Sequence, residues 1–212
     1  MARTVAWVGI LAMCVVRASA ASPGVYPPNC TVPNTIALVG SHASVPDAVG
    51  RFTVVVRDIA NNPRNGASVV IDLSPCPDVL VCADQLDASA TVNCAAKTVR
   101  KFTDVMGSVS FTILGGSNGS GNATTLLHGV RIFANGLQIG SPTAACYDLG
   151  GQNGLNINDL SVWLADYGTP GNPTFGRSDF DGDGAIGIND LSRWLTAYGA
   201  DGSETGCAAS CP

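Results

Sequence analysis

The sequence predicts a mainly β chain that ends in a small all-α part. Short β-branched segments separated by turn residues occupy the stretch from about Ile36 to Ser141. After Cys146 the pattern changes to a repeat of 31 residues, in which a polar Gly-rich loop precedes an amphipathic helix pattern. The first 20 residues differ from both parts. We therefore divide the chain into residues 1–20, 21–145 and 146–212.

The first 20 residues have the features of a secretory signal peptide. Arg3 supplies a positive charge, Val5–Val16 is apolar, and Ala18-Ser19-Ala20 offers a cleavage site of small residues. The apolar segment is too short to span a bilayer. Cys14 leaves a lipoprotein as an alternative, although Met13 is larger than the residue that usually precedes a lipidated cysteine. We expect cleavage after the small residues and a chain that is secreted, either extracellular, at a cell surface or periplasmic.

Charge is spread unevenly over the rest of the chain. Residues 21–145 hold seven acidic and seven basic side chains, whereas residues 146–212 hold nine acidic and two basic ones. A negative C-terminal part repels nucleic acid and anionic membrane surfaces, and it suits a hard cation. No later segment is long and apolar enough for a membrane helix. We therefore expect no nucleic-acid partner and no membrane span.

The stretch from Ile36 to Ser141 is predicted to form an antiparallel β-sandwich. Asn135-Gly136 is a strong signal for a two-residue hairpin turn. Alternation after Gly107 places Val109, Phe111 and Ile113 on one face of a strand. The expected strands are Phe52–Arg57, Ala67–Leu73, Gly107–Leu114, Val130–Ala134 and Leu137–Ile139.

Three segments of this stretch resemble the bacterial immunoglobulin-like domains of surface proteins. They are Phe52–Asp58, Asn65–Val69 and Thr103–Phe111. In that family a strand ending in Arg-Asp, a Gly-Ala turn and a Thr-Asp-x-x-Gly-x-x-x-Phe return recur. The resemblance implies an immunoglobulin-like β-sandwich for residues 21–145.

Two copies of one loop–helix unit follow Cys146. Residues 148–168 align without a gap on residues 179–199, and 11 of the 21 positions are identical. Each copy has apolar residues on one helical face and a Gly at its end. One amphipathic helix cannot bury its apolar face alone, so we expect the two helices to pack on each other. The predicted faces are Ile157, Leu160, Trp163, Leu164 and Tyr167 in the first copy, and Ile188, Leu191, Trp194, Leu195 and Tyr198 in the second.

The loop of the second copy is predicted to bind calcium. Asp179, Asp181 and Asp183 occupy its first, third and fifth positions, and Gly184 at the sixth permits a sharp turn. Carboxylates this close repel one another unless a cation lies between them. The predicted ligands are the side chains of Asp179, Asp181, Asp183 and Asp190 and the carbonyl of Ala185.

The loop of the first copy is a weaker candidate of the same kind. Asp148 and Asp159 hold its ends, but Gly150 and Gln152 stand where the second loop has carboxylates. Fewer charges imply a lower affinity for calcium, so binding by this loop stays open. Its candidate ligands are Asp148, Gln152, Gly154, Asn156 and Asp159.

Two such loops, each preceding one helix, resemble the dockerin module, a calcium-binding pair of EF-hand-like repeats. The residues that match its motif are Asp179, Asp181, Asp183, Gly184, Ile186 and Asp190. The resemblance implies calcium-dependent folding and docking onto a cohesin partner, which in the best-known cases anchors polysaccharide-degrading enzymes to a scaffold. The positions that face cohesin correspond to Ile157-Asn158 and Ile188-Asn189, where many family members have small hydroxyl pairs.

Seven cysteines follow the predicted signal peptide. Export to an oxidising compartment favours disulfides, and the odd number leaves one thiol free or paired with another chain. Cys76, Cys82 and Cys94 lie near one another and could pair locally, while Cys146 and Cys207 bracket the repeats and could join their ends. A zinc site is the rival interpretation, but no CxxC spacing and no nearby His supports it.

The sequence shows no catalytic constellation. His42 and His128 are the only histidines, Glu204 is the only Glu, and no Ser lies in a nucleophile-elbow motif. The predicted sandwich has no Trp, so direct carbohydrate binding is not expected. We therefore predict a secreted, non-catalytic calcium-binding protein that acts in protein–protein docking or extracellular assembly. The alternatives are an accessory of a polysaccharide-degrading, cellulosome-like system docked through a cohesin, and an uncharacterised hydrolase.

Overall fold

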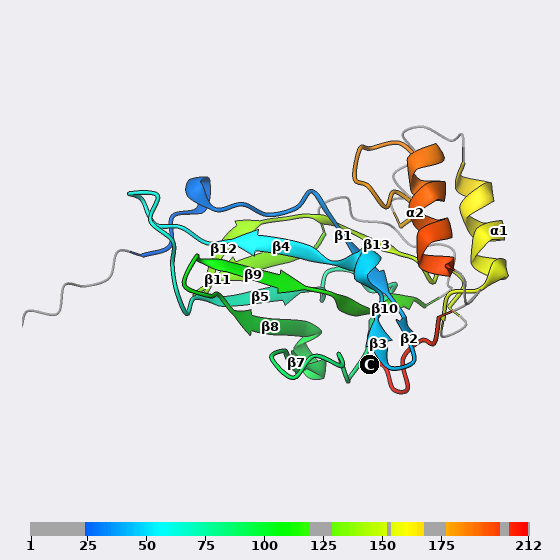
Figure 1. Ribbon diagram of the computed structural model, residues 1–212, viewed down its shortest axis with the longest axis horizontal. Helices are drawn as coiled ribbons and strands as arrows, with labels where there is room; N and C mark the ends of the chain where they lie inside the picture. Colours follow the sequence, from blue (N-terminus) through cyan, green and yellow to red (C-terminus); the bar gives the residue numbers. More distant parts are fainter. Residues whose placement is uncertain (1–23, 119–128, 152–153, 168–176, 200–203, 212) are drawn as a thin grey trace, which may run out of the picture.

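The computed structural model describes residues 24–118, 129–151, 154–167, 177–199 and 204–211. The predicted signal peptide, and Gln152 among the candidate ligands, lie outside these residues. Over the described ranges the chain is mainly β with two short α-helices, which confirms the prediction at this level (Figure 1). Neither of these helices is long and apolar enough to cross a membrane.

A five-stranded antiparallel sheet has the order β12-β11-β5-β8-β7. Its strands are β5 (Ser68–Asp72), β7 (Thr91–Asn93), β8 (Thr98–Phe102), β11 (Arg131–Ala134) and β12 (Leu137–Gly140). The turn between the last two has Asn135 and Gly136 at φ +49° and +82°. These left-handed conformations are the ones that a two-residue hairpin needs, so the Asn-Gly prediction is confirmed.

A four-stranded sheet has the order β13-β1-β10-β6. Its strands are β1 (Thr35–Val39), β6 (Val79–Val81), β10 (Ile113–Ser117) and β13 (Thr143–Cys146). β1 runs parallel to both β10 and β13, whereas β10 and β6 are antiparallel. The predicted all-antiparallel pairing is therefore wrong for β1. Parallel neighbours need long connections, and patterns of local turns do not reveal them.

Two antiparallel pairs complete the strands. β4 (Phe52–Val55) pairs with β9 (Ser108–Phe111), and β2 (Ser41–His42) pairs with β3 (Val45–Pro46). Val109, Phe111 and Ile113 are all buried, as their alternation predicted, although they belong to the separate strands β9 and β10. The short 3-10 helices are η1 (Pro27–Asn29), η2 (Ala48–Gly50) and η3 (Cys94–Ala96).

β1 is buried on both faces because its alternate side chains enter two different apolar clusters. Ile36 and Leu38 pack in a cluster with side chains of the five-stranded sheet and of the β4–β9 pair. Ala37 and Val39 point the other way, into a cluster that includes Trp163 of the first repeat. β13 and β10 alternate in the same manner. The four-stranded sheet thus contacts the other strands with one face and the repeats with the other.

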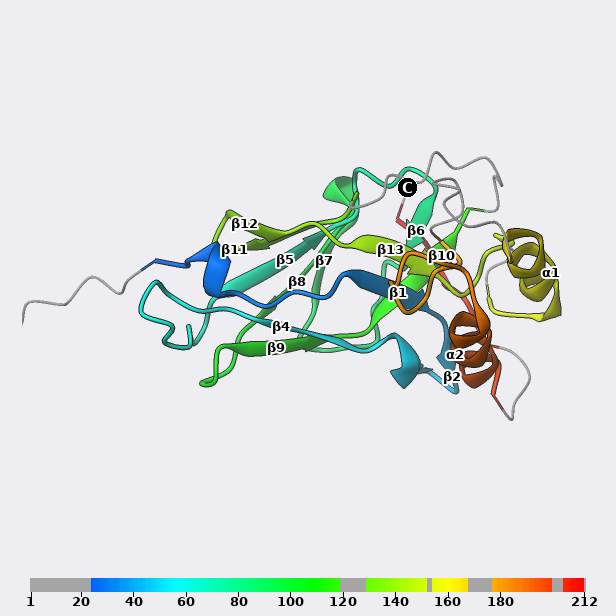
Figure 2. The ribbon, with the colours of Figure 1, turned by 90° about the horizontal axis from the view of Figure 1, so that it is seen from above.

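The two helices of the repeats are α1 (Ile157–Asp166) and α2 (Ile188–Tyr198). They lie side by side at one end of the molecule, next to β1 and β10, in both Figure 1 and Figure 2. Trp163 and Trp194 are 1% and 0% exposed, and they share a cluster with Tyr147 and Phe180. The predicted domain limit at residues 145 and 146 stays a prediction, and residues on both sides of it contribute to this cluster.

The predicted apolar faces of the helices are buried only in part. Each helix contacts the cluster along a narrow stripe, so the flanking apolar side chains face solvent, contrary to the expectation. The exposed residues of the predicted faces are Ile157, Leu164, Tyr167, Ile188 and Leu195, and Val162, which was not assigned to a face, is exposed as well. We call this set the exposed helix surface.

The C-terminal segment, residues 204–211, returns to the strands and is fixed there by disulfides. Cys82 bonds to Cys207 and Cys94 bonds to Cys211. Backbone hydrogen bonds accompany them, since the Cys211 N–H donates to the Val81 carbonyl at 2.7 Å. Neither local pairing nor a Cys146–Cys207 bond is present in the described residues, so both disulfide expectations are wrong. The remaining described cysteines, Cys30, Cys76 and Cys146, are free thiols.

Candidate metal centre

Three carboxylates of the second loop converge. Asp179, Asp181 and Asp183 each place an oxygen within 4.8 Å of the others. Gly182 and Gly184 have φ of +76° and +87°, so the loop bends at two left-handed positions. The structure thus brings together the carboxylates that the sequence placed at the first, third and fifth loop positions.

Backbone amides hold these carboxylates in place. Asp179 accepts hydrogen bonds from the N–H groups of Gly182, at 2.7 Å, and Gly184, at 3.0 Å. Asp181 accepts from the Asp183 N–H at 3.1 Å, and Asp183 accepts from the Ala185 N–H at 2.8 Å. Burial, opposed by these amides and reinforced by Asp190 and Asp181, raises the pKa of Asp179. The negative charges of the neighbouring carboxylates repel one another, and a cation bound between them would offset that repulsion.

Asp190 accepts hydrogen bonds from both ends of the loop. Its Oδ1 accepts from the N–H groups of Phe180, at 2.7 Å, and Asp181, at 3.2 Å, and its Oδ2 accepts from the Gly187 N–H at 2.8 Å. The side chain therefore joins both ends of the loop to the first turn of α2. Burial raises its pKa. Its role as a ligand stays a prediction, as does that of the Ala185 carbonyl.

The first loop has the same hydrogen-bond frame. Asp159 accepts from the N–H groups of Leu149 at 2.8 Å, Gly150 at 2.7 Å and Asn156 at 2.7 Å. These donors lie 31 positions before the three donors to Asp190. The duplication seen in the sequence therefore extends to individual hydrogen bonds.

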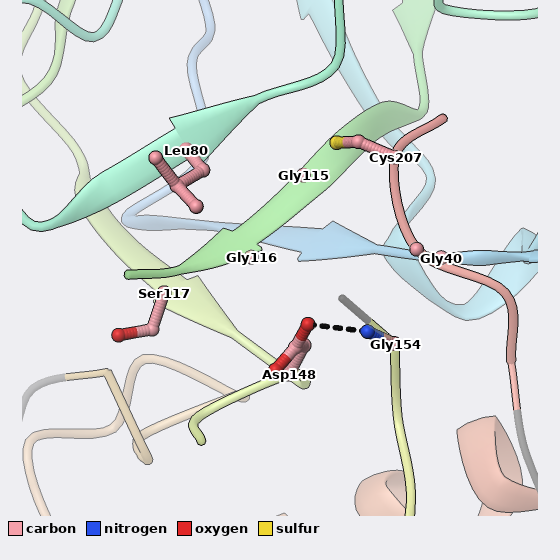
Figure 3. A pocket seen from close by; sticks show the side chains of 9 residues that line it. Gly40, Leu80, Gly115, Gly116, Ser117, Asp148, Gly154 and Cys207 are labelled. Atoms are coloured by element: carbon pink, nitrogen blue, oxygen red, sulfur yellow. Dashed lines mark hydrogen bonds between the residues drawn. The ribbon is translucent and has the colours of Figure 1, made fainter. Parts of the chain in front are cut away.

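Among the described residues, the other candidate ligands of the first loop, Asp148, Gly154 and Asn156, make hydrogen bonds within the protein. Asp148 accepts from the N–H groups of Gly151 at 3.2 Å and Gly154 at 2.6 Å, the latter shown in Figure 3. Asn156 caps α1 by accepting from the Asn158 N–H at 2.9 Å, and its amide donates to the Gly154 carbonyl at 3.1 Å. Beside Asp148 lies a cavity of about 10 Å³, room for about one water molecule. In the part of this loop that the structure describes, no three carboxylates converge.

The second loop lies directly against β1. A Cβ on Gly182 would come within 2.5 Å of the Thr35 Oγ1. Phe180, the second residue of the loop, stacks on Tyr147 with ring centroids 4.4 Å apart. The geometry of the carboxylates is therefore coupled to the packing of the loop on the four-stranded sheet.

The predicted docking residues occupy equivalent places on the two helices. Ile157 and Ile188 begin α1 and α2, and these residues are 58% and 68% exposed. Asn158 and Asn189, the next residues, are exposed as well. All four are accessible, and the two isoleucines belong to the exposed helix surface.

No protein-family model, no curated protein and no solved structure matches this chain. The resemblances to immunoglobulin-like domains and to dockerin modules therefore rest on sequence motifs, and we use them only in the proposal below.

A second group of ligand-type side chains was not anticipated from the sequence. His42, Asp47 and Glu204 place one ligand atom each within 4.8 Å of one another. Burial, followed by the neighbouring carboxyl of Asp47, raises the pKa of Glu204 to about 8. The only available signal was compositional, because Glu204 is the single Glu in the chain.

Proposed function

We propose that this chain is a secreted, non-catalytic calcium-binding protein that docks onto a protein partner in an extracellular or cell-surface assembly. The observation that carries the proposal is the convergence of Asp179, Asp181 and Asp183 immediately before α2. Carboxylate oxygens at alternate loop positions suit Ca²⁺, which takes oxygen ligands in a flexible shell. The two disulfides fit an oxidising compartment.

Calcium has mainly a structural role in this proposal. The second loop connects β1, through Gly182 and Thr35, with the first turn of α2, through Asp190. Without a cation, the repulsion among the three carboxylates acts on this connection. If Ca²⁺ binds the folded state and not the unfolded state, it stabilises the loop and α2, and this stabilisation grows with the logarithm of the calcium concentration.

The docking part of the proposal rests on the exposed helix surface. Ile157 and Ile188 are large, exposed, apolar and related by the 31-residue repeat. A dockerin-like pair on an immunoglobulin-like β part would therefore present the same contact twice. The second candidate function, an accessory of a polysaccharide-degrading system docked through a cohesin, uses the same surface.

The calcium proposal is tested by isothermal titration and circular dichroism of the full chain. We expect tight binding of one Ca²⁺ by the second loop, and a loss of helical signal on chelation. Asp181→Asn combined with Asp183→Asn should abolish both effects. Asp84→Asn is the matched control, because Asp84, like Asp183, is exposed and accepts one turn hydrogen bond, from the Leu86 N–H. Equal calcium binding by the double variant and the control would refute the proposal.

Docking is tested separately with purified cohesin-like domains from the same genome. Ile157→Asp or Ile188→Asp alone should leave binding through the other repeat, whereas the double variant should lose it. Val105→Asp serves as the control, since Val105 is 72% exposed in a turn of the β part. Loss of binding in the control, or binding that survives in the double variant, excludes the exposed helix surface as the contact.

A further inference from the structure

Two ligand-type side chains that are close in sequence, His42 and Asp47, meet the distant Glu204 beside α2. His42 ends β2, Asp47 precedes η2, and Glu204 begins the C-terminal segment. The Nε2 of His42 lies 3.8 Å from Oε1 of Glu204, and one Asp47 oxygen completes a group within 4.8 Å. None of the three belongs to the loops of the repeats.

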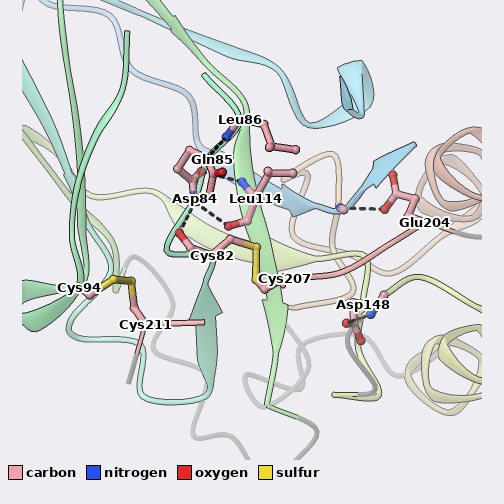
Figure 4. Close-up of a disulfide and its surroundings, with 12 residues drawn as sticks. Cys82, Asp84, Gln85, Leu86, Cys94, Leu114, Asp148, Glu204, Cys207 and Cys211 are labelled. Carbon is pink, nitrogen blue, oxygen red and sulfur yellow. Dashed lines mark hydrogen bonds between the residues drawn. A yellow bond between two sulfur atoms is a disulfide. The ribbon is translucent and has the colours of Figure 1, made fainter. Parts of the chain in front are cut away.

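Glu204 is the most constrained of the three. Its side chain is 0% exposed, and its Oε2 accepts a hydrogen bond from the Gly40 N–H at 2.8 Å (Figure 4). Its Oε1 is buried and has no hydrogen-bond partner among the described residues. A buried carboxylate oxygen without a hydrogen-bond donor destabilises the folded state, and a bound proton or cation would remove this destabilisation. The His42 Nε2 lies 3.8 Å from this atom, and an Asp47 carboxylate oxygen belongs to the same group.

We propose that His42, Asp47 and Glu204 bind one divalent transition-metal ion of the Zn²⁺ class. One imidazole nitrogen and two carboxylate oxygens are a ligand set that such ions accept, whereas the hard ion Ca²⁺ prefers oxygen alone. Two ligand atoms at about 2.1 Å from one ion lie at most about 4.2 Å apart. The 3.8 Å between His42 and Glu204 therefore falls within reach of a shared ion.

The surroundings fit a site that is fixed on one side and open on the other. The Asp47 Oδ1 accepts from the Val49 N–H at 2.9 Å, which orients the carboxylate, while the Gly40 N–H orients Glu204. The His42 side chain is 28% exposed, so an ion can enter from its side, and water can occupy a fourth position. The His42 Nε2 also lies 3.4 Å from the Ala197 carbonyl of α2, a contact that the ion would replace.

The bound ion would connect the β2–β3 pair with the start of the C-terminal segment. That segment also carries Cys207 and Cys211, whose disulfides appear with Glu204 in Figure 4. The Glu204 N–H donates to the Leu155 carbonyl of the first loop at 3.1 Å. The metal site would therefore hold the segment where it passes between the first loop and the strands, independently of the calcium loop.

The test is titration of the full chain with Zn²⁺ in buffer that already contains saturating Ca²⁺. We expect one Zn²⁺ per chain, and His42→Asn should weaken binding by more than the about 10–100-fold typical of losing a supporting hydrogen bond. His128→Asn is the matched control, because it removes the other histidine. Cys30→Ser is a second control, because the Cys30 thiol is partly exposed. The absorption spectrum of the Co²⁺-substituted chain should show nitrogen and oxygen ligands and no thiolate.

Glu204→Gln tests the buried ligand, with circular dichroism to verify folding. This variant should lose Zn²⁺ binding while keeping Ca²⁺ binding. If Glu204→Gln does not fold, His42→Asn still tests the site, because His42 is partly exposed. No Zn²⁺ binding by the wild type, equal binding by wild type and His42→Asn, or a thiolate spectrum would each overturn the proposal. In the first case the remaining explanation is a proton shared by Asp47 and Glu204.

Discussion

The guanidinium group of Arg177 donates two hydrogen bonds to the carboxylate of Asp78, at 2.7 and 2.8 Å, across 99 positions of the chain. Its third nitrogen donates to the Ala144 carbonyl in β13 at 2.6 Å. Arg177 and Asp78 are 5% and 3% exposed. Because Arg177 lies two residues before Asp179, this buried pair fixes the start of the second loop against the strands.

Removing the Arg177 side chain should therefore destabilise the folded protein. Arg177→Met leaves the Asp78 carboxylate buried without its partner, and we expect a loss of about 3–5 kcal/mol in the free energy of unfolding. Arg177→Met combined with Asp78→Leu should recover most of the loss. Urea denaturation measures both. Arg131→Met is the control, since its ion pair with Asp72 is partly exposed and should contribute at most about 1 kcal/mol. Equal losses in Arg177→Met and Arg131→Met would contradict this assignment.

The disulfide pairing predicts a definite peptide map. Digestion without reduction should yield one peptide pair joined by Cys82 and Cys207 and another joined by Cys94 and Cys211. Replacing Cys94 and Cys211 by Ser should lower the free energy of unfolding by about 2–5 kcal/mol, because the bond removes conformations from the unfolded chain. Cys30→Ser, at a free thiol, should change it little. A map in which Cys146 is joined to Cys207 would contradict the structure.

Asp166, at the end of α1, should make stability depend on pH. Its Oδ2 accepts from the Ser178 hydroxyl at 2.5 Å, and burial raises its pKa from 3.8 to about 6. The folded state thus holds this proton more tightly than the unfolded state does. The resulting stabilisation is complete below pH 3.8, falls as the pH rises to about 6, and is constant above.

Asp166→Asn removes this titration. Relative to the wild type, the variant should therefore gain roughly 1–3 kcal/mol between about pH 4 and pH 7. Urea denaturation across this range, with calcium saturating, measures the difference. If the free energy of unfolding of Asp166→Asn changes with pH in the same way as that of the wild type, burial does not raise the pKa of this carboxyl.

Two glycines of the second loop form a matched pair for a fourth test. Both have positive φ, but a Cβ on Gly182 would meet Thr35, whereas a Cβ on Gly184 would enter open space. Alanine at either position should cost roughly 1–2 kcal/mol in backbone strain. Gly182→Ala should weaken calcium binding further, because the loop must move away from β1. Calcium titration and urea denaturation of the two variants measure the difference, and equal effects would show that the contact with Thr35 does not position the loop.

Features set by local sequence were predictable. The 31-residue repeat predicted both helices and the equivalence of the loops, since Asp159 and Asp190 stand at the same position of each copy. Asn135-Gly136 predicted its hairpin because the turn conformation depends on those two residues alone. The convergence of Asp179, Asp181 and Asp183 follows from alternate spacing in one short loop.

Features set by distant contacts were not predictable. β1 has parallel neighbours because β10 and β13 reach it from far along the chain, and its apolar run has no alternation to indicate two different partners. Cys82 and Cys207 are 125 positions apart, and nothing near either residue indicates the pairing. The exposure of Ile157 and Ile188 likewise depends on which stripe of each helix meets the sheet.

The covalent attachment of the C-terminal segment has a mechanical consequence. The repeats leave the strands through the peptide chain after β13 and are joined to them again through Cys82–Cys207. A pulling force applied by a partner on α1 or α2 would thus be divided between two attachment points in the strands. Freeing the C-terminal end of the repeats from the strands would require breaking both sulfur–sulfur bonds, and in an extracellular setting such an anchor resists tension even when the helices unravel.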